Sequence, residues 1–136
     1  DEKGENKPVI MGSYGIGVSR LMGTLVEVFG ETDSMVWPEE VAPFKVHLIA
    51  ISNGDEEVSK ESIEIYQKLK SSGVEVLYDD REDKIAGEKF ADADLLGCPV
   101  RVLIGKKSLD AGGAEIKKRR EKEFIIVPLA EIGRHL

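Results

Sequence analysis

The stretch Lys45–Asp79, KVHLIAISNGDEEVSKESIEIYQKLKSSGVEVLYD, contains the pattern that decides the fold. Its apolar run over residues 45–51 predicts a buried strand, and residues 74–79 predict a second one. Between them an acidic turn leads into a predicted helix over residues 56–72, which Gly73 ends. One face of that helix carries its apolar residues: Val58, Ile65, Tyr66 and Leu69. The order β-α-β implies parallel strands joined by a right-handed crossover.

The rest of the chain extends this unit. The downstream elements that the pattern predicts are a helix over 87–96 closed by Gly97, a strand over 99–105, strands over 114–120 and 123–128, and a closing helix over 129–136. Only two residues separate the last two predicted strands, which suits a hairpin. Residues 41–136 therefore predict an α/β domain, a mixed five-stranded sheet with flanking helices.

The first 40 residues predict a separate piece. The run VIMGSYGIG over residues 9–17 is typical of a short strand and a turn. A helix follows, with Gly30 as its C-cap, because apolar residues recur at helical spacing: Val18, Leu21, Met22, Leu25, Val26 and Phe29. The segment ETDSMVWPEEVAPF contains two prolines and predicts a linker, with a domain boundary near residue 40.

Composition limits the classes of function. The net charge of −7 over 136 residues means that any nucleic-acid contact must come from a local basic surface. One such surface could lie between Arg101 and Glu123, where eight basic and four acidic side chains give a local charge of 8 − 4 = +4. These charges suit either RNA binding or the solvation of a strand and its turn.

Other sequence features exclude several kinds of site. Cys98 is the single cysteine, so it cannot form an internal disulfide, and it has no metal-ligand spacing with the two histidines. No segment is long and apolar enough to span a membrane, and DEKGENKPV has no signal-peptide character. We therefore expect a cytoplasmic protein without a metal site or a membrane partner.

The glycine-rich stretch MGSYGIGVSR ends at Arg20, and three explanations of it compete. A Rossmann turn requires a third glycine where Arg20 stands, and a P-loop requires Lys-Ser or Lys-Thr after its last glycine. An ordinary strand-to-helix turn needs no arginine. A guanidinium in such a turn suits a nucleotide, because it can stack on adenine or neutralise a phosphate.

The stretch MGSYGIGVSRLMGTLVE resembles motif 3 of the class II aminoacyl-tRNA synthetases, and most of all the bacterial-type prolyl enzymes. VWPEEVAPFKVHLI is similar to their junction between catalytic and anticodon-binding domains, and LYDDREDKIAGEKFADADLLGCPVRVLIGKKSLDAGGAEIKKRR resembles the anticodon-binding domain itself. The resemblance implies that Arg20 contacts ATP as a catalytic residue, and that Gly15 and Gly17 shape the turn so that nucleotide and backbone approach closely.

The resemblance also implies partners. A synthetase of this class takes proline, ATP with Mg²⁺ and proline tRNA, and forms a homodimer. Motifs 1 and 2 of the class are not found in these 136 residues. We therefore expect the chain to be the C-terminal part of a proline–tRNA ligase. The strand–helix piece in residues 1–40 would be a remnant of its catalytic domain, and residues 41–136 its anticodon-binding domain. Alone, the chain should be inactive and carry no bound cofactor.

An anticodon offers single-stranded bases, and the family's proline anticodons share two guanines. Guanine presents O6 and N7 to a basic group, and its N1–H and N2–H to a carboxylate. By the resemblance, the anticodon-binding residues are Asp80, Arg81, Glu88, Lys89, Phe90, Glu115, Lys117 and Arg119. Strand alternation puts residues 115, 117 and 119 on one face. The plainer alternatives are a local ion pair between Asp80 and Arg81 and a core position for Phe90.

Two other functions stay open from the sequence. Threonyl, histidyl and glycyl synthetases share the anticodon-binding fold, although the wording GSYGIGVSR favours the prolyl enzyme. A non-catalytic, synthetase-like tRNA-binding protein is the third possibility, and Arg20 argues against it because a pure binding module needs no ATP-contacting arginine.

Overall fold

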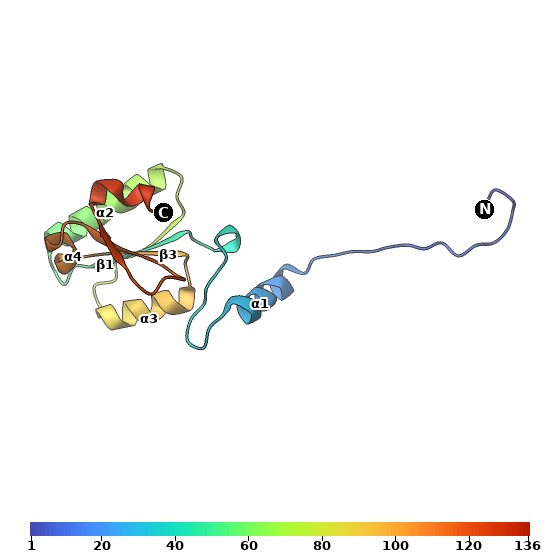
Figure 1. The fold of residues 1–136 in the computed structure, drawn as a ribbon, viewed down its shortest axis with the longest axis horizontal. Helices are drawn as coiled ribbons and strands as arrows, with labels where there is room; N and C mark the ends of the chain where they lie inside the picture. The colour runs from blue at the N-terminus through green and yellow to red at the C-terminus, as the bar shows by residue number, and fades with distance from the viewer.

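Five strands form one sheet in the order β2-β1-β3-β4-β5, in a computed structural model that describes residues 1–136 (Figure 1). The strands are β1 (Val46–Ile51), β2 (Val76–Asp79), β3 (Val100–Gly105), β4 (Ala114–Lys118) and β5 (Ile125–Val127). The central strand β1 pairs in parallel with β2 and β3, whereas β4 runs antiparallel to β3 and β5 runs antiparallel to β4. The prediction of a mixed five-stranded α/β sheet is confirmed.

Helices cover both faces of this sheet. Helix α2 (Glu56–Ser71) and the 3-10 helix η2 (Leu129–Arg134) lie on one face, and α3 (Ala86–Leu96) lies on the other (Figure 1). This layering follows from the β-α-β connections, because right-handed crossovers place successive helices on either side of a sheet according to the direction in which the strands are added.

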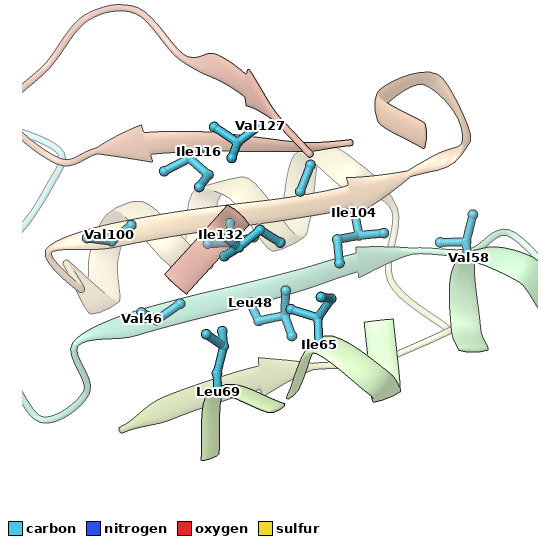
Figure 2. Close-up of a cluster of buried hydrophobic side chains, with 12 residues drawn as sticks. Val46, Leu48, Val58, Ile65, Leu69, Val100, Ile104, Ile116, Val127 and Ile132 are labelled. Carbon is cyan, nitrogen blue, oxygen red and sulfur yellow. The ribbon is translucent and has the colours of Figure 1, made fainter. Parts of the chain in front are cut away.

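The core lies between the sheet and helix α2. The side chains of alternate residues in β1 and β3 meet apolar residues of α2 there, as Figure 2 shows for Leu48 and Ile65. The cluster contains twelve buried residues: Val46, Leu48, Val58, Ile65, Leu69, Val100, Val102, Ile104, Ala114, Ile116, Val127 and Ile132. Every strand except the edge strand β2 contributes to it, so the sheet domain has one continuous core.

Local sequence determines where α2 begins and where α3 ends. The Asp55 carboxylate accepts hydrogen bonds from the backbone N–H groups of Glu57 and Val58, at 2.9 and 3.3 Å, and so caps α2. Gly97 ends α3 in the left-handed conformation, with φ of 67°.

The N-terminal piece differs from its prediction. Helix α1 (Val18–Phe29) forms with Gly30 as its C-cap, but the short strand expected within residues 9–17 does not. No strand of the chain lies beside this segment, and an isolated strand has no partner for its backbone N–H and C=O groups. Figure 1 shows the segment before α1 running away from the sheet domain.

Several element boundaries also differ. A short helix, α4 (Lys106–Asp110), follows β3 and was not predicted; the Ser108 hydroxyl caps it by accepting from the Gly105 N–H at 2.9 Å. Strand β4 ends at Lys118, so residues 119–124 make a longer hairpin loop than the predicted two residues. The closing helix, predicted over residues 129–136, is a 3-10 helix over Leu129–Arg134 that follows Pro128.

The predicted linker is ordered against the sheet domain rather than free of it. It contains the 3-10 helix η1 (Glu39–Val41), and Met35 and Val36 are buried, at 7% and 6% exposure. The linker therefore begins to pack before residue 40.

Candidate nucleic-acid interface

The α3 side of the sheet presents the polar residues that the sequence singled out. Strand alternation and register place one row across this face, from Asp79 through Ile49 and Leu103 to Glu115 and Ile126. Helix α3 packs chiefly on β1. Ile126 in β5 is 37% exposed, so the β4–β5 end of this face is open to a ligand.

Four side chains form a mixed-charge group at this open end, which we name the β4 patch: Phe90, Arg101, Glu115 and Lys117. Arg101 and Lys117 are register partners on β3 and β4, and Glu115 lies one step along the same face. The Arg101 guanidinium lies 4.9 Å from the centre of the Phe90 ring. Burial lowers the pKa of Arg101 from its ordinary value, although neighbouring Asp94 opposes the shift. All four side chains of the patch are partly exposed.

A second group lies where β2 ends. Arg81 binds Asp79 through two hydrogen bonds, Nε to Oδ1 at 2.9 Å and Nη2 to Oδ2 at 2.8 Å, and its Nη2 also donates to Asp92 Oδ2 at 2.8 Å. These bonds raise the pKa of Arg81 and lower that of the buried Asp79 carboxyl. Arg81 therefore does not pair with Asp80, as the sequence suggested. It pairs with Asp79 and Asp92 instead.

The remaining residues predicted around β2 and α3 have different surroundings. Asp80 is exposed. The Glu88 carboxylate accepts from the Lys84 ammonium at 3.2 Å and from the Ile85 N–H at 3.3 Å, which lowers the Glu88 pKa and closes the first turn of α3. Lys89 is buried, and its ammonium donates to the carbonyl oxygen of Ala50 at 2.7 Å.

Lys89 therefore has a structural position. Its ammonium also lies 3.5 Å from the Asp79 carbonyl oxygen and 3.7 Å from Asp79 Oδ1, so it joins the start of α3 to the ends of β1 and β2. The RNA contact expected of Lys89 would require this buried cation to leave three oxygen atoms.

Arg119 lies at the opposite end of the sheet from Arg81. Its guanidinium contacts the Asp94 carboxylate and the carbonyl oxygens of Met35 and Asp94. The prediction grouped Arg119 with Glu115 and Lys117 by strand alternation, but β4 ends at Lys118 and alternation stops there. The structure does not bring Arg119 into the β4 patch.

Gly15, Gly17 and Arg20 are exposed. They belong to the segment before α1 and to α1 itself, which lie apart from the sheet domain (Figure 1). The Arg20 side chain forms no ion pair or hydrogen bond within the chain. A Cβ added to Gly15 would meet nothing within 4 Å. These residues by themselves do not enclose a nucleotide, so an ATP site containing them would need further groups.

Sequence reasoning missed some of the polar residues on this face. Asp79, Asp92, Asp94 and Arg101 hold or accompany the predicted ones. A signal for Arg101 exists, because it is the single charged residue in the apolar run PVRVLIG, but its side-chain partners lie on α3 and β4. No group of three or more histidine, cysteine, aspartate or glutamate side chains is arranged to hold a metal ion. None of the helices combines the length and the apolarity needed to cross a membrane.

Comparison with known proteins gives this face its context. A family model described as an anticodon binding domain matches residues 45–136. The proline–tRNA ligase of Geobacillus sp. strain WCH70 is 48% identical over 132 residues, which are 97% of this chain and 23% of that protein. That of Caldicellulosiruptor saccharolyticus is 47% identical over 129 residues, covering 95% and 22%.

A solved structure is also similar. Prolyl-tRNA synthetase of Giardia lamblia, in complex with prolyl-adenylate, superposes with a TM-score of 0.73 at 27% identity, covering 83% of this chain and 25% of that one. The chain thus spans about a quarter of the length of the relatives that it matches. Because the family model covers all five strands and the helices between them, the chain belongs to the anticodon-binding domain family.

Proposed function

We propose that this chain is the anticodon-binding part of a cytoplasmic prolyl-tRNA synthetase and binds the anticodon loop of proline tRNA. The observation that carries the proposal is the β4 patch, an open group of acidic, basic and aromatic side chains on a domain of the anticodon-binding family. In this proposal residues 1–40 are a catalytic-domain remnant with its linker, and residues 41–136 are the anticodon-binding domain.

The chemistry of the β4 patch suits guanine. The Glu115 carboxylate can accept from N1–H and N2–H of the base, and the Lys117 ammonium can donate to O6 or N7. The Phe90 ring and the Arg101 guanidinium offer planar groups on which a splayed-out base can stack. These interactions would supply hydrogen bonding and stacking within one patch.

Asp80, Arg81 and Glu88 form the second part of the proposed surface. Asp80 is exposed, and the two carboxylates that bind Arg81 leave part of its guanidinium accessible, with the side chain 40% exposed. A guanine could replace Asp92 as a partner of Arg81 while Asp79 keeps the guanidinium in place. We assign Lys89 a supporting role here, since its buried ammonium holds the β2 end on which Asp79 and Arg81 stand.

We further propose that Arg20 contacts ATP in the complete protein, with Gly15 and Gly17 shaping the turn. A permanently charged, planar guanidinium would stabilise the negative charge that develops as diphosphate leaves during proline activation. Mg²⁺ would accompany the ATP, and two copies of the complete protein would form the dimer. In that protein Arg20→Ala should slow proline-dependent ATP–diphosphate exchange and leave tRNA binding intact; the reverse pattern would contradict the assignment.

Filter binding tests the anticodon proposal with this 136-residue chain. Glu115→Ala should weaken binding of proline tRNA by about ten-fold or more and reduce discrimination against a tRNA whose anticodon guanines are replaced. The matched control is Glu61→Ala, which removes a partly exposed carboxylate of α2 on the opposite face of the sheet.

A salt series separates base contacts from phosphate contacts. If Lys117 contacts a phosphate, Lys117→Ala weakens all tRNAs alike and lowers the salt dependence; if it contacts a base, discrimination falls as well. Should both Glu115→Ala and Lys117→Ala bind every tRNA as the unaltered chain does, the β4 patch is not the RNA surface.

A further inference from the structure

The segment Met35–Trp37, which we name the strap, is bound along the C-terminal end of α3. The Met35 N–H donates to the Asp94 carbonyl oxygen at 2.9 Å, and the Trp37 N–H donates to that of Gly97 at 3.3 Å. The indole Nε1–H of Trp37 donates to the Leu96 carbonyl oxygen at 3.0 Å. The strap therefore satisfies carbonyl groups at the end of α3 that have no partner within the helix.

Arg119 joins the strap to α3 from the side of β4. Its Nε donates to the Met35 carbonyl oxygen at 3.1 Å, and its two terminal nitrogens contact the Asp94 carboxylate and, at 3.2 Å, the Asp94 carbonyl oxygen. The side chain is only 14% exposed. Its own N–H donates to the Pro99 carbonyl oxygen at 2.8 Å, so its backbone is fixed at the start of β3.

A short segment connects helix α1 to the strap. The helix ends at Phe29, and residues 31–34 form a closed turn. In that turn the Glu31 N–H donates to the Ser34 carbonyl oxygen at 2.7 Å, and the Ser34 hydroxyl donates to the Glu31 carboxylate at 3.0 Å. These two hydrogen bonds join Glu31 to Ser34, and only Gly30 separates this closed turn from the end of α1.

Gly97 shows that the strap is seated closely. A Cβ added at this residue would lie 2.3 Å from the Met35 carbonyl oxygen, far inside contact distance. The same carbonyl accepts from Arg119, so the site has room for the guanidinium on one side and only for a glycine on the other.

We infer that Arg119 is a positioning residue, which fixes the strap on the sheet domain and thereby sets the placement of α1 and Arg20 relative to the β4 patch. This role is independent of the anticodon proposal. Lys117 and Arg119 are two residues apart: the first faces the open side of the sheet, whereas the second is directed into the joint with the strap. A single short segment thus serves two separate tasks.

Hydrogen exchange and fluorescence of the 136-residue chain test the inference. Arg119→Ala should speed exchange of the Met35 and Trp37 amides by at least about ten-fold, since a charge-assisted hydrogen bond is lost, while the Leu48 and Val102 amides of the core keep their protection. Trp37 is the single tryptophan, so its emission reports the strap directly, and it should shift toward that of an exposed indole.

Two variants act as references. Arg119→Lys can restore one bond to the Met35 carbonyl oxygen but not the forked contact with Asp94, so its exchange rates should fall between those of the unaltered chain and Arg119→Ala. Lys117→Ala should leave both strap signals unchanged. Unchanged strap amides and emission in Arg119→Ala would overturn the inference.

A distance measurement tests the placement of α1 itself. With spin labels at Glu27→Cys on α1 and Lys60→Cys on α2, in a Cys98→Ala background, the unaltered strap should give a narrow distance distribution that Arg119→Ala broadens. A distribution that stays narrow would contradict the positioning role. Loss of tRNA binding in Arg119→Ala with unchanged strap signals would instead make Arg119 an RNA contact, whereas failure of the β4 patch would appear only in the Glu115 and Lys117 variants.

Discussion

Helices α1 and α2 have similar sequence patterns but differ in burial. Both are amphipathic, with apolar residues at helical spacing. Helix α2 buries Val58, Ile65 and Leu69 against the sheet, whereas α1 buries none of its residues. An apolar stripe therefore predicts that a helix forms and which face it would bury, but not whether the same chain provides a surface to cover it.

The largest effect should come from the core of the sheet domain. Leu48→Ala removes a fully buried side chain at the centre of the cluster and should lower the free energy of unfolding by about 3 kcal/mol. Urea denaturation followed by circular dichroism would measure it. A change below about 1 kcal/mol would mean that the sheet and α2 are not packed as one core.

The next largest loss of stability should come from Gly97, where the strap contacts the end of α3. Gly97→Ala and Gly73→Ala both place a side chain at positive φ, 67° and 80°, which costs roughly 1–2 kcal/mol. Only Gly97→Ala also meets the Met35 carbonyl oxygen, whereas nothing lies within 4 Å of the Cβ at Gly73. Gly97→Ala should therefore be the more destabilising in urea and should alter Trp37 emission; equal effects would show that the strap is not held there.

An intermediate effect should appear in the pH dependence of the free energy of unfolding of the sheet domain. His47 is buried, its Nδ1 has no hydrogen-bond partner, and burial lowers its pKa despite the nearby Asp79 carboxylate. In the unfolded chain the His47 imidazole takes up a proton at about pH 6.5, while in the folded chain it does so only at lower pH. Stability from the neutral imidazole is thus present above that pH and is lost as the pH falls toward the folded pKa.

Urea midpoints between pH 7.5 and 5 would measure this decline. His47→Leu removes the titrating group without leaving a donor unpaired, and should flatten the dependence in this range. His135→Gln, near the C-terminus, is the control and should retain it. An equally steep decline in His47→Leu would assign the dependence to other groups.

The smallest effect should come from α1. Met22→Gln replaces a side chain that is 57% exposed, so the free energy of unfolding of the sheet domain should change by less than about 0.5 kcal/mol. A loss of 2 kcal/mol or more would show that α1 packs on the sheet domain and would abolish the contrast with α2. The same denaturation assay compares both helices directly.

Much of the fold could be predicted from local patterns. The strands over 45–51 and 99–105 and the helix over 56–72 are long, strongly patterned and bounded by glycine or acidic caps, and each appears within two residues of its predicted limits. Helix α4 was missed because five residues are too few for a periodic signal. The candidate site was predicted less well, because the partners of Arg81, Lys89 and Arg119 come from other elements of the chain.

By itself, the sequence determined the mixed α/β sheet, the amphipathic helices and the segments in which polar residues would gather, because these depend on spacing along the chain. Only the tertiary structure decided which charges stay open. Lys89 and Arg119 carry the positive charge that RNA contacts need, yet folding brings carbonyl and carboxylate oxygens around both. Glu115 and Lys117 remain partly exposed on a face that no helix fully covers. A buried charge needs such oxygen partners, and only the folded chain supplies them.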